Sequence, residues 1–364
     1  MINFVPIESY YPIYINICLF LVLFTILHTR VVPMESPKNL SFINISGLLL
    51  LAFLVLYIGL RPIHPIFGDT VNYVVTYSNY QIGLPIKNAE DYGWHVFMKA
   101  LAPYMSIHAF FTIISFIYIF PLYKISTTYF KEYWYYAFLM FVVSFSFWTY
   151  SVNGIRNGAA CSLFLWGLCY EKRKILMVMF FGFALLFHKT LFLPILAYLA
   201  TYFYNNPKFY FKGWLMCIPL SLVLGGVWIS LFSSLGFADD RLSGYLSSSS
   251  EEGTFSATGF RWDFLFHSAF AVFAGWYFVV KKGFSDALYN RLLNTYLICN
   301  GFWVLVIRAN FSNRFAYLSW FMMAIVIIYP LLKKNFFKNQ HALLGNIILA
   351  YFSFTYLMFY LYYS

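Results

Sequence analysis

Charged residues are scarce in this chain. Asp, Glu, Lys and Arg make up 10% of its 364 residues, whereas 62% are apolar and 24% are aromatic. A water-soluble domain carries about 25% charged residues, so the composition excludes an ordinary soluble protein. The apolar runs are continuous, which also excludes the alternating strands of an outer-membrane barrel. The sequence therefore predicts an all-α polytopic membrane protein, with residues 1–364 forming a single integral-membrane domain.

Metal and nucleotide motifs are also missing. The five cysteines lie in apolar runs, without CxxC spacing or a neighbouring histidine, so neither a zinc site nor a disulfide framework is indicated. No glycine-rich nucleotide loop is present, and the pairs Asp239-Asp240 and Glu251-Glu252 fall in a polar loop where solvated charge is the simpler interpretation. We therefore expect no metal, no cofactor and no nucleic-acid partner, and we interpret the net charge of +11 as a topological signal.

Twelve apolar segments are predicted to be transmembrane. The run 175–204 would be about 45 Å long as one helix and carries His188-Lys189 in its middle, so we interpret it as two short helices. The start of the chain lacks the basic region and cleavage site of a signal peptide, so we expect its first apolar segment to be a membrane helix. The predicted segments are 12–29, 41–60, 105–123, 133–150, 155–170, 175–187, 190–204, 214–232, 262–280, 292–307, 314–332 and 342–362.

Basic residues divide unevenly between the two sides of this arrangement. With both termini outside, the inner loops hold 15 of the 24 Lys and Arg but only four of the 13 acidic residues. The positive-inside rule therefore favours twelve segments with outer termini. A single span over 175–204 would abolish the asymmetry. The long outer loops are then 61–95 and 233–261, and the segment 92–104 is expected to form a short interfacial or re-entrant helix.

Polar residues gather on the predicted outer side, above all in the stretch 144–170, which contains SVNGIRNGAA. In a helix that starts near Asn153, the residues Asn153, Arg156 and Asn157 share one face. An arginine at membrane depth usually faces a water-filled cavity or an anionic ligand; the alternative is an arginine that snorkels to lipid phosphates. Other outer arginines whose guanidinium forks suit a lipid-linked pyrophosphate are Arg241, Arg261, Arg308 and Arg314.

Two residues are candidates for orienting or deprotonating an acceptor hydroxyl. His188, in LLFHKTLFLP, could instead be a hydrogen-bonded structural histidine. Asp69, in FGDTVNY, is either a general base or the N-cap of a following helix. Outer aromatic residues that could stack on sugar rings are Tyr73, Tyr77, Trp94 and Tyr245.

The order of these motifs resembles the EpsG-like group of Wzy-type bacterial polysaccharide polymerases over residues 60–330. Two positions depart from that group, which usually has Gln where this chain has Asn157 and often has Ser and a small residue where it has Lys189-Thr190. The motifs are Arg61…Gly68-Asp69…Tyr73, Asn153-x-x-Arg156-Asn157-x-x-Ala160, Phe187-His188-x-Thr190, Arg241-x-x-x-Tyr245, and Arg314-x-x-Tyr317 followed by an apolar helix that ends in Pro330.

The resemblance implies a glycosyltransferase of the bacterial inner membrane, related to the GT-C architecture. Its donor and acceptor would both be undecaprenyl-diphosphate-linked oligosaccharides, and membrane lipid and a chain-length regulator protein would be further partners. His188 and Asp69 would then be the catalytic candidates. The pyrophosphate would be bound by Arg156 and Arg314, assisted by Arg308 and Arg241, and the sugars would contact Asn153, Asn157, Tyr73 and Tyr245.

Other functions use similar residues. A flippase for lipid-linked oligosaccharides also needs cations, but it typically has pseudo-symmetric halves, which this sequence does not show. A membrane O-acyltransferase receives its acyl groups from the cytoplasm, and the outer clustering of polar residues argues against it. An O-antigen ligase performs the chemistry of a polymerase on a different acceptor, so only the family resemblance separates the two.

Overall fold

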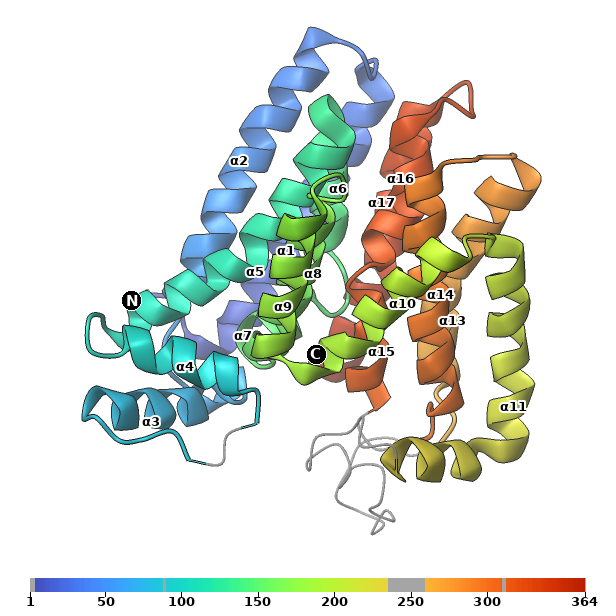
Figure 1. The fold of residues 1–364 in the computed structure, drawn as a ribbon. Coiled ribbons are helices and arrows are strands. Elements are labelled where there is room, and N and C mark those ends of the chain that lie inside the picture. Colours follow the sequence, from blue (N-terminus) through green and yellow to red (C-terminus); the bar gives the residue numbers. More distant parts are fainter. Residues whose placement is uncertain (1–3, 88–89, 235–258, 310–311, 364) are drawn as a thin grey trace. The chain divides into compact units, whose positions relative to one another are not determined.

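The computed structural model describes residues 4–87, 90–234, 259–309 and 312–363. These residues form helices and connecting turns and no β-strand (Figure 1). Seven of the described helices are long and apolar enough to cross a membrane, and Lys174–Phe187 and Lys189–Phe203 are shorter apolar helices. The predicted all-α polytopic class is confirmed, whereas the number of twelve crossings stays a prediction. Arg241 and Tyr245 lie outside the described residues.

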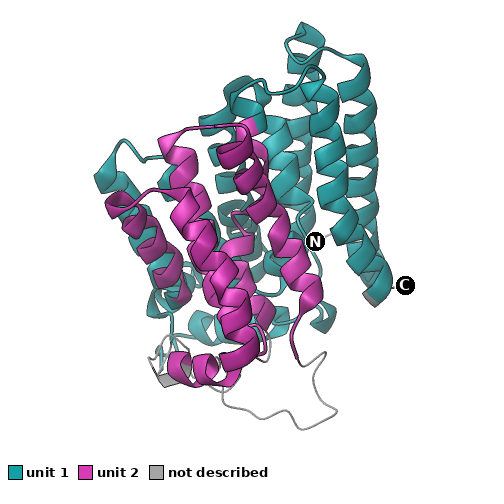
Figure 2. Cartoon of the chain, turned by 90° about the vertical axis from the view of Figure 1, so that its right-hand side faces the viewer, with its two compact units in different colours: residues 1–189, 331–364 teal, residues 190–330 magenta. Residues whose placement is uncertain are grey.

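The chain divides into two compact units, residues 1–189 with 331–364 (unit 1) and residues 190–330 (unit 2), as Figure 2 shows. Unit 1 contains α1 (Tyr10–Val31), α2 (Pro37–Gly59), α3 (Thr70–Gln81), α4 (Tyr92–Leu101), α5 (Ile107–Phe130), α6 (Trp134–Val142), α7 (Phe147–Val152), α8 (Ile155–Leu168), α9 (Lys174–Phe187) and α17 (Gln340–Tyr363). Unit 2 contains α10 (Phe192–Phe203), α11 (Pro207–Ser234), α13 (Trp262–Trp276), α14 (Ala287–Leu305), α15 (Ser312–Trp320) and most of α16 (Met323–Lys333).

The long helices of unit 1 run back and forth, so their turns alternate between two ends. The first and last helices, α1 and α17, are antiparallel neighbours: Gly345 packs against Ile26 near one end, and the rings of Tyr11 and Phe359 meet at 5.3 Å near the other. The two termini therefore lie at the same end of unit 1 (Figure 1). This agrees with the expectation that both termini share one side of the membrane, while the side itself stays a prediction.

Two short helices, α3 and α4, lie across the ends of the long helices in Figure 1. The predicted helix within 92–104 is confirmed as α4, and α3 begins directly after Asp69, in agreement with the alternative that Asp69 is the N-cap of a following helix. Neither helix is long enough to cross a membrane. The pair lies at the end of unit 1 at which α2 ends.

The predicted span 133–150 is broken in the structure into α6 and α7. Ser144 and Ser146 lie in the break, and serine competes with the helix for backbone hydrogen bonds. Neighbouring helices satisfy the carbonyls released there: Thr355 Oγ1 donates to Val143 O at 2.8 Å, and the Tyr118 hydroxyl donates to Phe147 O at 3.1 Å. Irregular backbone at membrane depth is tolerated when surrounding helices supply such partners.

Unit 2 is held together by a buried polar network that involves four helices. The side-chain amide of Asn300 in α14 accepts from Trp214 Nε1 at 2.7 Å and donates to Ser268 Oγ at 3.1 Å and Ser319 Oγ at 2.9 Å. Trp320 Nε1 also donates to Ser268 Oγ, at 2.7 Å. Interhelical hydrogen bonds of this kind join membrane helices where the hydrophobic effect cannot.

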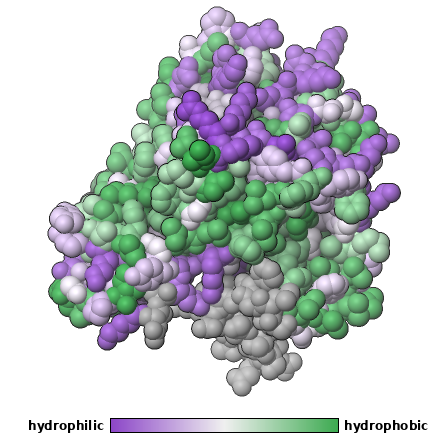
Figure 3. Space-filling view, in the orientation of Figure 1, coloured by the Kyte–Doolittle hydropathy of each residue, from purple (hydrophilic) through white to green (hydrophobic). Residues whose placement is uncertain are grey.

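The surface agrees with a membrane setting. Figure 3 shows hydrophobic side chains across the middle of the view and hydrophilic side chains toward the end at which α1 turns into α2. The turn residues Arg30 and Lys38 are exposed there, as expected for basic residues at a membrane boundary.

Candidate functional site

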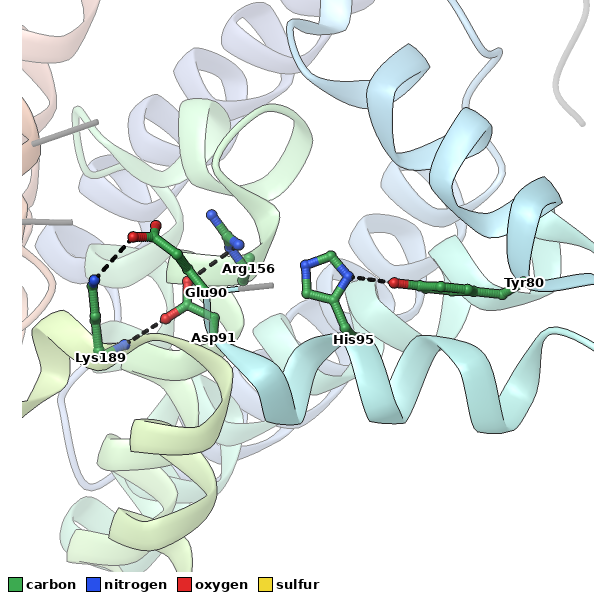
Figure 4. A network of polar contacts seen from close by, with 6 residues as sticks. All are labelled: Tyr80, Glu90, Asp91, His95, Arg156 and Lys189. Carbon is green, nitrogen blue, oxygen red and sulfur yellow. Dashed lines mark hydrogen bonds and ion pairs between the residues drawn. The ribbon is translucent and has the colours of Figure 1, made fainter. Parts of the chain in front are cut away.

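An ion pair joins the first turn of α8 to the start of α4. Arg156 Nη1 lies 3.1 Å from Asp91 Oδ2, and the side chain of Asp91 is 0% exposed while that of Arg156 is 19% exposed (Figure 4). Removing a carboxylate from water is costly unless its charge and hydrogen bonds are matched. Arg156 therefore serves as counter-ion to a fully buried acid, and part of its guanidinium remains open to solvent.

Asp91 is held in an uncommon backbone conformation, with φ 49° and ψ 50°. Non-glycine residues seldom adopt this left-handed region, and they persist there only when the surroundings fix them. The second carboxylate oxygen, Oδ1, accepts from the backbone N–H of Lys189 at 2.8 Å, and Lys189 Nζ pairs with Glu90 Oε1 at 3.2 Å. The buried carboxylate of Asp91 thus connects the start of α8 to the end of α9.

Close packing of α4 on α9 places Asp91 within reach of these partners. A Cβ atom at Gly93 would lie 2.5 Å from Leu186 Cβ and 2.7 Å from the Leu186 carbonyl oxygen. Only glycine permits this approach, because real Cβ atoms do not come so close to other atoms. Gly93 therefore sets the distance between the start of α4 and the end of α9.

A second contact fixes the loop that carries Asp69. Asn153 Oδ1 accepts from the backbone N–H of Asp69 at 2.9 Å, and a side chain at Gly68 would overlap the Asn153 amide. Gly68 also has φ 63°, a value that favours glycine. The amide oxygen of Asn153, a predicted substrate-binding group, is thus engaged in holding the Gly68–Asp69 turn against the start of α8.

Asp69 occupies the N-cap position of α3, but its side chain makes no capping hydrogen bond to the backbone. Its Oδ1 instead accepts from Asn72 Nδ2 at 3.3 Å, and the residue is half-buried. The side chain therefore remains available for a reacting hydroxyl, and the proposed role as a base stays a prediction.

Arg61 is buried beneath this loop and makes structural contacts. It donates to Ile58 O at 2.8 Å and to Val152 O at 3.2 Å, and its guanidinium lies 4.9 Å from the centre of the Phe111 ring. Burial lowers the pKa of Arg61 to about 10, so the side chain is still protonated at neutral pH. The motif arginine at position 61 thus ties the end of α2 to the end of α7.

His95 lies one helical turn after Asp91 and was not predicted as a site residue. Its Nδ1 is 2.8 Å from the Tyr80 hydroxyl on α3 (Figure 4). Burial lowers the pKa of His95, the positive charge of Arg156 lowers it further, and the negative charge of Asp91 partly offsets both. A neutral imidazole at neutral pH can accept or donate a proton.

The remaining predicted residues of unit 1 surround this cluster. His188 is buried at the end of α9, directly before Lys189, and its backbone N–H donates to Ala184 O at 3.0 Å. The ring of Tyr73 meets Trp94 edge-on at 5.7 Å, which places this predicted sugar platform in a packed aromatic contact. Asn157 Oδ1 accepts from Cys161 Sγ at 3.5 Å.

The other arginines that we predicted to lie at the outer side belong to unit 2, as far as the structure describes them. Arg308 is exposed and donates through Nη2 to Leu222 O at 3.4 Å, while Arg314 is half-buried in the first turn of α15. Arg261 forms a two-pronged pair with Asp263, at 2.9 and 2.6 Å, which favours a structural role for it. The convergence of Arg156, Arg308 and Arg314 on one pyrophosphate stays a prediction.

Within the described ranges, no three His, Cys, Asp or Glu side chains are grouped so as to hold a metal ion.

The site residues that sequence reasoning missed are Glu90, Asp91, His95 and Tyr80. One signal for the acids was available, because the predicted outer side carries as many acidic as basic residues, and equal numbers at a membrane surface indicate pairing.

These observations define a polytopic helical membrane protein whose candidate site combines an ion pair between Arg156 and the buried Asp91 with a histidine whose pKa is lowered. The chain belongs to the EpsG family, whose model matches residues 44–364. This confirms the resemblance drawn from the motifs, and membership indicates a polysaccharide polymerase-like function in a membrane protein. No curated protein and no solved structure matches the chain.

Proposed function

We propose that this protein polymerises undecaprenyl-diphosphate-linked oligosaccharide repeat units at the outer face of the bacterial inner membrane, within a GT-C-like architecture. A hydroxyl of the incoming repeat unit attacks the anomeric carbon of the growing chain. The bond from that carbon to the diphosphate oxygen breaks, and the lipid diphosphate leaves with the bonding electrons. The proton of the hydroxyl passes to a side-chain base of the site.

The observation that carries this proposal is the state of Arg156 in a chain of the EpsG family. One guanidinium nitrogen is held by Asp91, the side chain is partly open to solvent, and Nε is buried without a hydrogen-bond partner among the described residues. A diphosphate oxygen would supply the missing acceptor. Guanidinium groups bind such oxygens in pairs and stabilise the charge that develops on a leaving diphosphate.

The base is proposed to be one of three side chains near this arginine. Asp69 is half-buried, His188 is buried at the corner beside Lys189, and His95 has a lowered pKa. A group that is deprotonated at neutral pH and lies within one hydrogen bond of the acceptor hydroxyl can take its proton. The pyrophosphate is assigned to Arg156 and Arg314, with Arg308 and Arg241 assisting.

Purified protein in liposomes tests the proposal directly. With only a lipid-diphosphate-linked repeat unit as substrate, we expect chains of increasing length and release of lipid diphosphate, without any nucleotide sugar and in the presence of EDTA. If chelation stops the reaction and a divalent ion restores it, arginines alone do not neutralise the leaving group. Asp69, Asp239 and Asp240 would then be the first candidates for metal ligands.

Cells that lack the protein distinguish a polymerase from the alternatives. Loss of long glycans with a single repeat unit retained supports the proposal. A flippase deletion would instead leave the lipid-linked unit on the inner side, and a ligase deletion would leave long chains attached to the lipid carrier. Either pattern contradicts polymerisation by this chain.

A further inference from the structure

The two ring nitrogens of His95 on α4 have different surroundings. Nδ1 lies 2.8 Å from the hydroxyl of Tyr80 on α3, and the two rings meet edge-on with their centroids 6.1 Å apart. Nε2 is directed away from Tyr80, toward the side on which Arg156 lies (Figure 4). All three residues belong to unit 1. The contact with Tyr80 therefore orients the ring and leaves Nε2 as the nitrogen that faces the candidate site.

The Tyr80 hydroxyl determines which ring nitrogen carries the proton. The side chain of Tyr80 is buried, and Nδ1 of His95 is its only hydrogen-bond partner within the described ranges. A phenol has a single O–H, and buried hydroxyl groups donate it to an acceptor. If Nδ1 were the protonated nitrogen, the hydroxyl proton of Tyr80 would have no acceptor among these residues. Tyr80 therefore donates to Nδ1, and the proton of a neutral imidazole ring is then on Nε2.

The charges around His95 favour the neutral ring. Burial lowers the pKa of His95, and the positive charge of Arg156 lowers it further, while Asp91 partly offsets both effects. Burial also raises the pKa of Tyr80, so its hydroxyl keeps the proton that it donates. A neutral ring whose Nδ1 accepts from Tyr80 has no free lone pair. Such a ring donates a hydrogen bond through Nε2 but does not deprotonate a hydroxyl.

His95 and Arg156 are linked through α4. Asp91 holds Arg156 Nη1 at 3.1 Å, and the side chain of Arg156 remains 19% exposed. His95 follows Asp91 by one helical turn, which places the two residues on the same face of α4. His95 is half-buried, so neither it nor Arg156 is sealed from solvent. A neutral N–H beside a guanidinium group adds a second donor for an anion without adding a second positive charge.

We propose that His95 Nε2–H donates a hydrogen bond to an oxygen of the lipid-linked diphosphate bound by Arg156, and that Tyr80 is the positioning residue that keeps the proton on this nitrogen. This inference rests on the proposed function of the site. As the bond to the anomeric carbon breaks, negative charge grows on the diphosphate. A preorganised donor stabilises that charge without transferring its proton. Asp69 and His188 are then the remaining candidates for the base.

Two substitutions of His95 distinguish a donor from a base. Glutamine supplies an amide N–H near the position of Nε2 but is not basic, whereas alanine supplies neither function. We expect His95→Ala to lower polymerisation in liposomes about a hundredfold and His95→Gln to stay within about tenfold of the unmodified chain. Equal losses in the two variants, at equal protein abundance, would identify His95 as the base and overturn the proposal.

Binding of the leaving group separates this inference from the proposed function. The probe is undecaprenyl diphosphate, added to the purified full-length chain in detergent without an acceptor. We expect His95→Ala to weaken its binding about tenfold, because a hydrogen bond to a charged group is lost, and His95→Gln to restore most of the affinity. Unchanged binding in His95→Ala would overturn the donor role and leave the polymerase proposal standing. No binding by the unmodified chain would contradict both.

Nitrogen NMR of isotope-labelled histidine reads the tautomer without any substrate. The His95 signals are assigned by their absence from His95→Gln, and we expect a protonated Nε2 and a hydrogen-bonded Nδ1. Tyr80→Phe should move the Nδ1 resonance and weaken the binding of undecaprenyl diphosphate.

Tyr57→Phe is the matched control for Tyr80→Phe. It also removes a buried tyrosine hydroxyl, but this hydroxyl donates to a backbone oxygen, Tyr10 O, at 2.9 Å. The His95 signals should therefore be unchanged in Tyr57→Phe. A proton on Nδ1 in the unmodified chain, or His95 signals that do not move in Tyr80→Phe, would overturn the assignment of Tyr80 and of the Nε2–H donor.

Discussion

Arg156 has two partners to satisfy under the proposed mechanism, a buried carboxylate and a diphosphate. A lysine at this position could keep the ion pair to Asp91, since it needs only one ammonium donor. It could not also present a planar fork to phosphate oxygens. The chemistry of the side chain, and not its charge alone, therefore decides the outcome of substitution.

We expect Arg156→Lys to lower polymerisation by about a hundredfold, nearly as much as Arg156→Ala, since loss of one preorganised donor to developing charge has about this effect. Protein abundance should stay close to normal in the lysine variant. The readout is glycan length in cells, supported by product formation in liposomes. Arg291→Lys is the matched control, because Arg291 stacks on Tyr202 at 3.9 Å and a lysine can keep that contact. Normal glycan length in Arg156→Lys would favour a snorkelling arginine.

Asp91 combines a buried charge with a left-handed backbone, and two substitutions separate these properties. Asparagine tolerates the conformation and can still accept from Lys189 N–H, so Asp91→Asn removes only the charge. Alanine also loses the acceptor and is strained at φ 49°. We expect a destabilisation of about 1–2 kcal/mol for Asn and about 3–4 kcal/mol for Ala. Thermal unfolding in detergent, followed by size-exclusion chromatography, measures the order, and equal losses would contradict it.

Alanine substitutions at Gly68 and Gly83, compared with each other, test the contact between Gly68 and Asn153. Both have positive φ, 63° and 85°, but a side chain at Gly68 would meet the Asn153 amide, whereas nothing lies within 4 Å at Gly83. Gly83→Ala should therefore cost only the conformational strain, about 1 kcal/mol. Gly68→Ala should cost more and also lower activity, because it displaces Asp69.

The double variant Gly68→Ala, Asn153→Ala checks the cause of that loss. Removing the amide relieves the overlap, so the effects of the two changes should be less than additive. Strict additivity would show that Gly68 and Asn153 act independently.

At the level of elements, the sequence predicted more of the helices than of their interruptions. Continuous apolar runs indicated the long helices correctly, because burial in lipid imposes a simple pattern of composition. The break after α6 depends on hydroxyl groups from α5 and α17, residues far away in the chain, so no local pattern marks it. The helix α3 is polar enough to resemble a loop, and its position follows from packing on α4.

The candidate site, like the helices, was predicted from the sequence only in part. The motif residues Asn153, Arg156 and Asp69 were identified from type and spacing, and the structure brings all three to one end of unit 1. Asp91 was missed because its importance arises from burial against α8 and α9. Burial of a single acid in a polar loop is a property of the folded chain.

The packing of α4 on α9 can be tested with two glycines of opposite expected effect. Gly93→Ala would place a methyl group 2.5 Å from Leu186 Cβ, which should push α4 away and break the Asp91 contacts. Gly182, in the middle of α9, has nothing within 4 Å of an added Cβ. Gly182→Ala should be neutral or stabilising by up to about 1 kcal/mol, because alanine favours helix. We expect loss of glycan polymerisation only in Gly93→Ala, and equal behaviour of the two variants would argue against a packing role.

At the scale of the whole molecule, function at the outer face requires a particular orientation in the membrane. In unit 1 the turns that carry Arg30 and Lys338 lie side by side at the end away from Arg156 (Figure 1). Lys172 follows the C-terminal end of α8, the helix whose first turn carries Arg156. The charge asymmetry of the sequence predicts that the basic end faces the inside. The pairing of termini at one end of unit 1 is consistent with this assignment but does not choose the side.

Labelling of single cysteines determines the side. The five native cysteines are buried or half-buried, so a background without them should fold with small packing losses. Asn79 is exposed on α3, and Lys172 is exposed between α8 and α9. In intact spheroplasts an impermeant thiol reagent should label Asn79→Cys and leave Lys172→Cys unmodified until the membrane is permeabilised. The opposite pattern would place Arg156 on the inner side, where lipid-linked repeat units are not polymerised in the proposed reaction, and it would overturn both the topology and the function that depends on it.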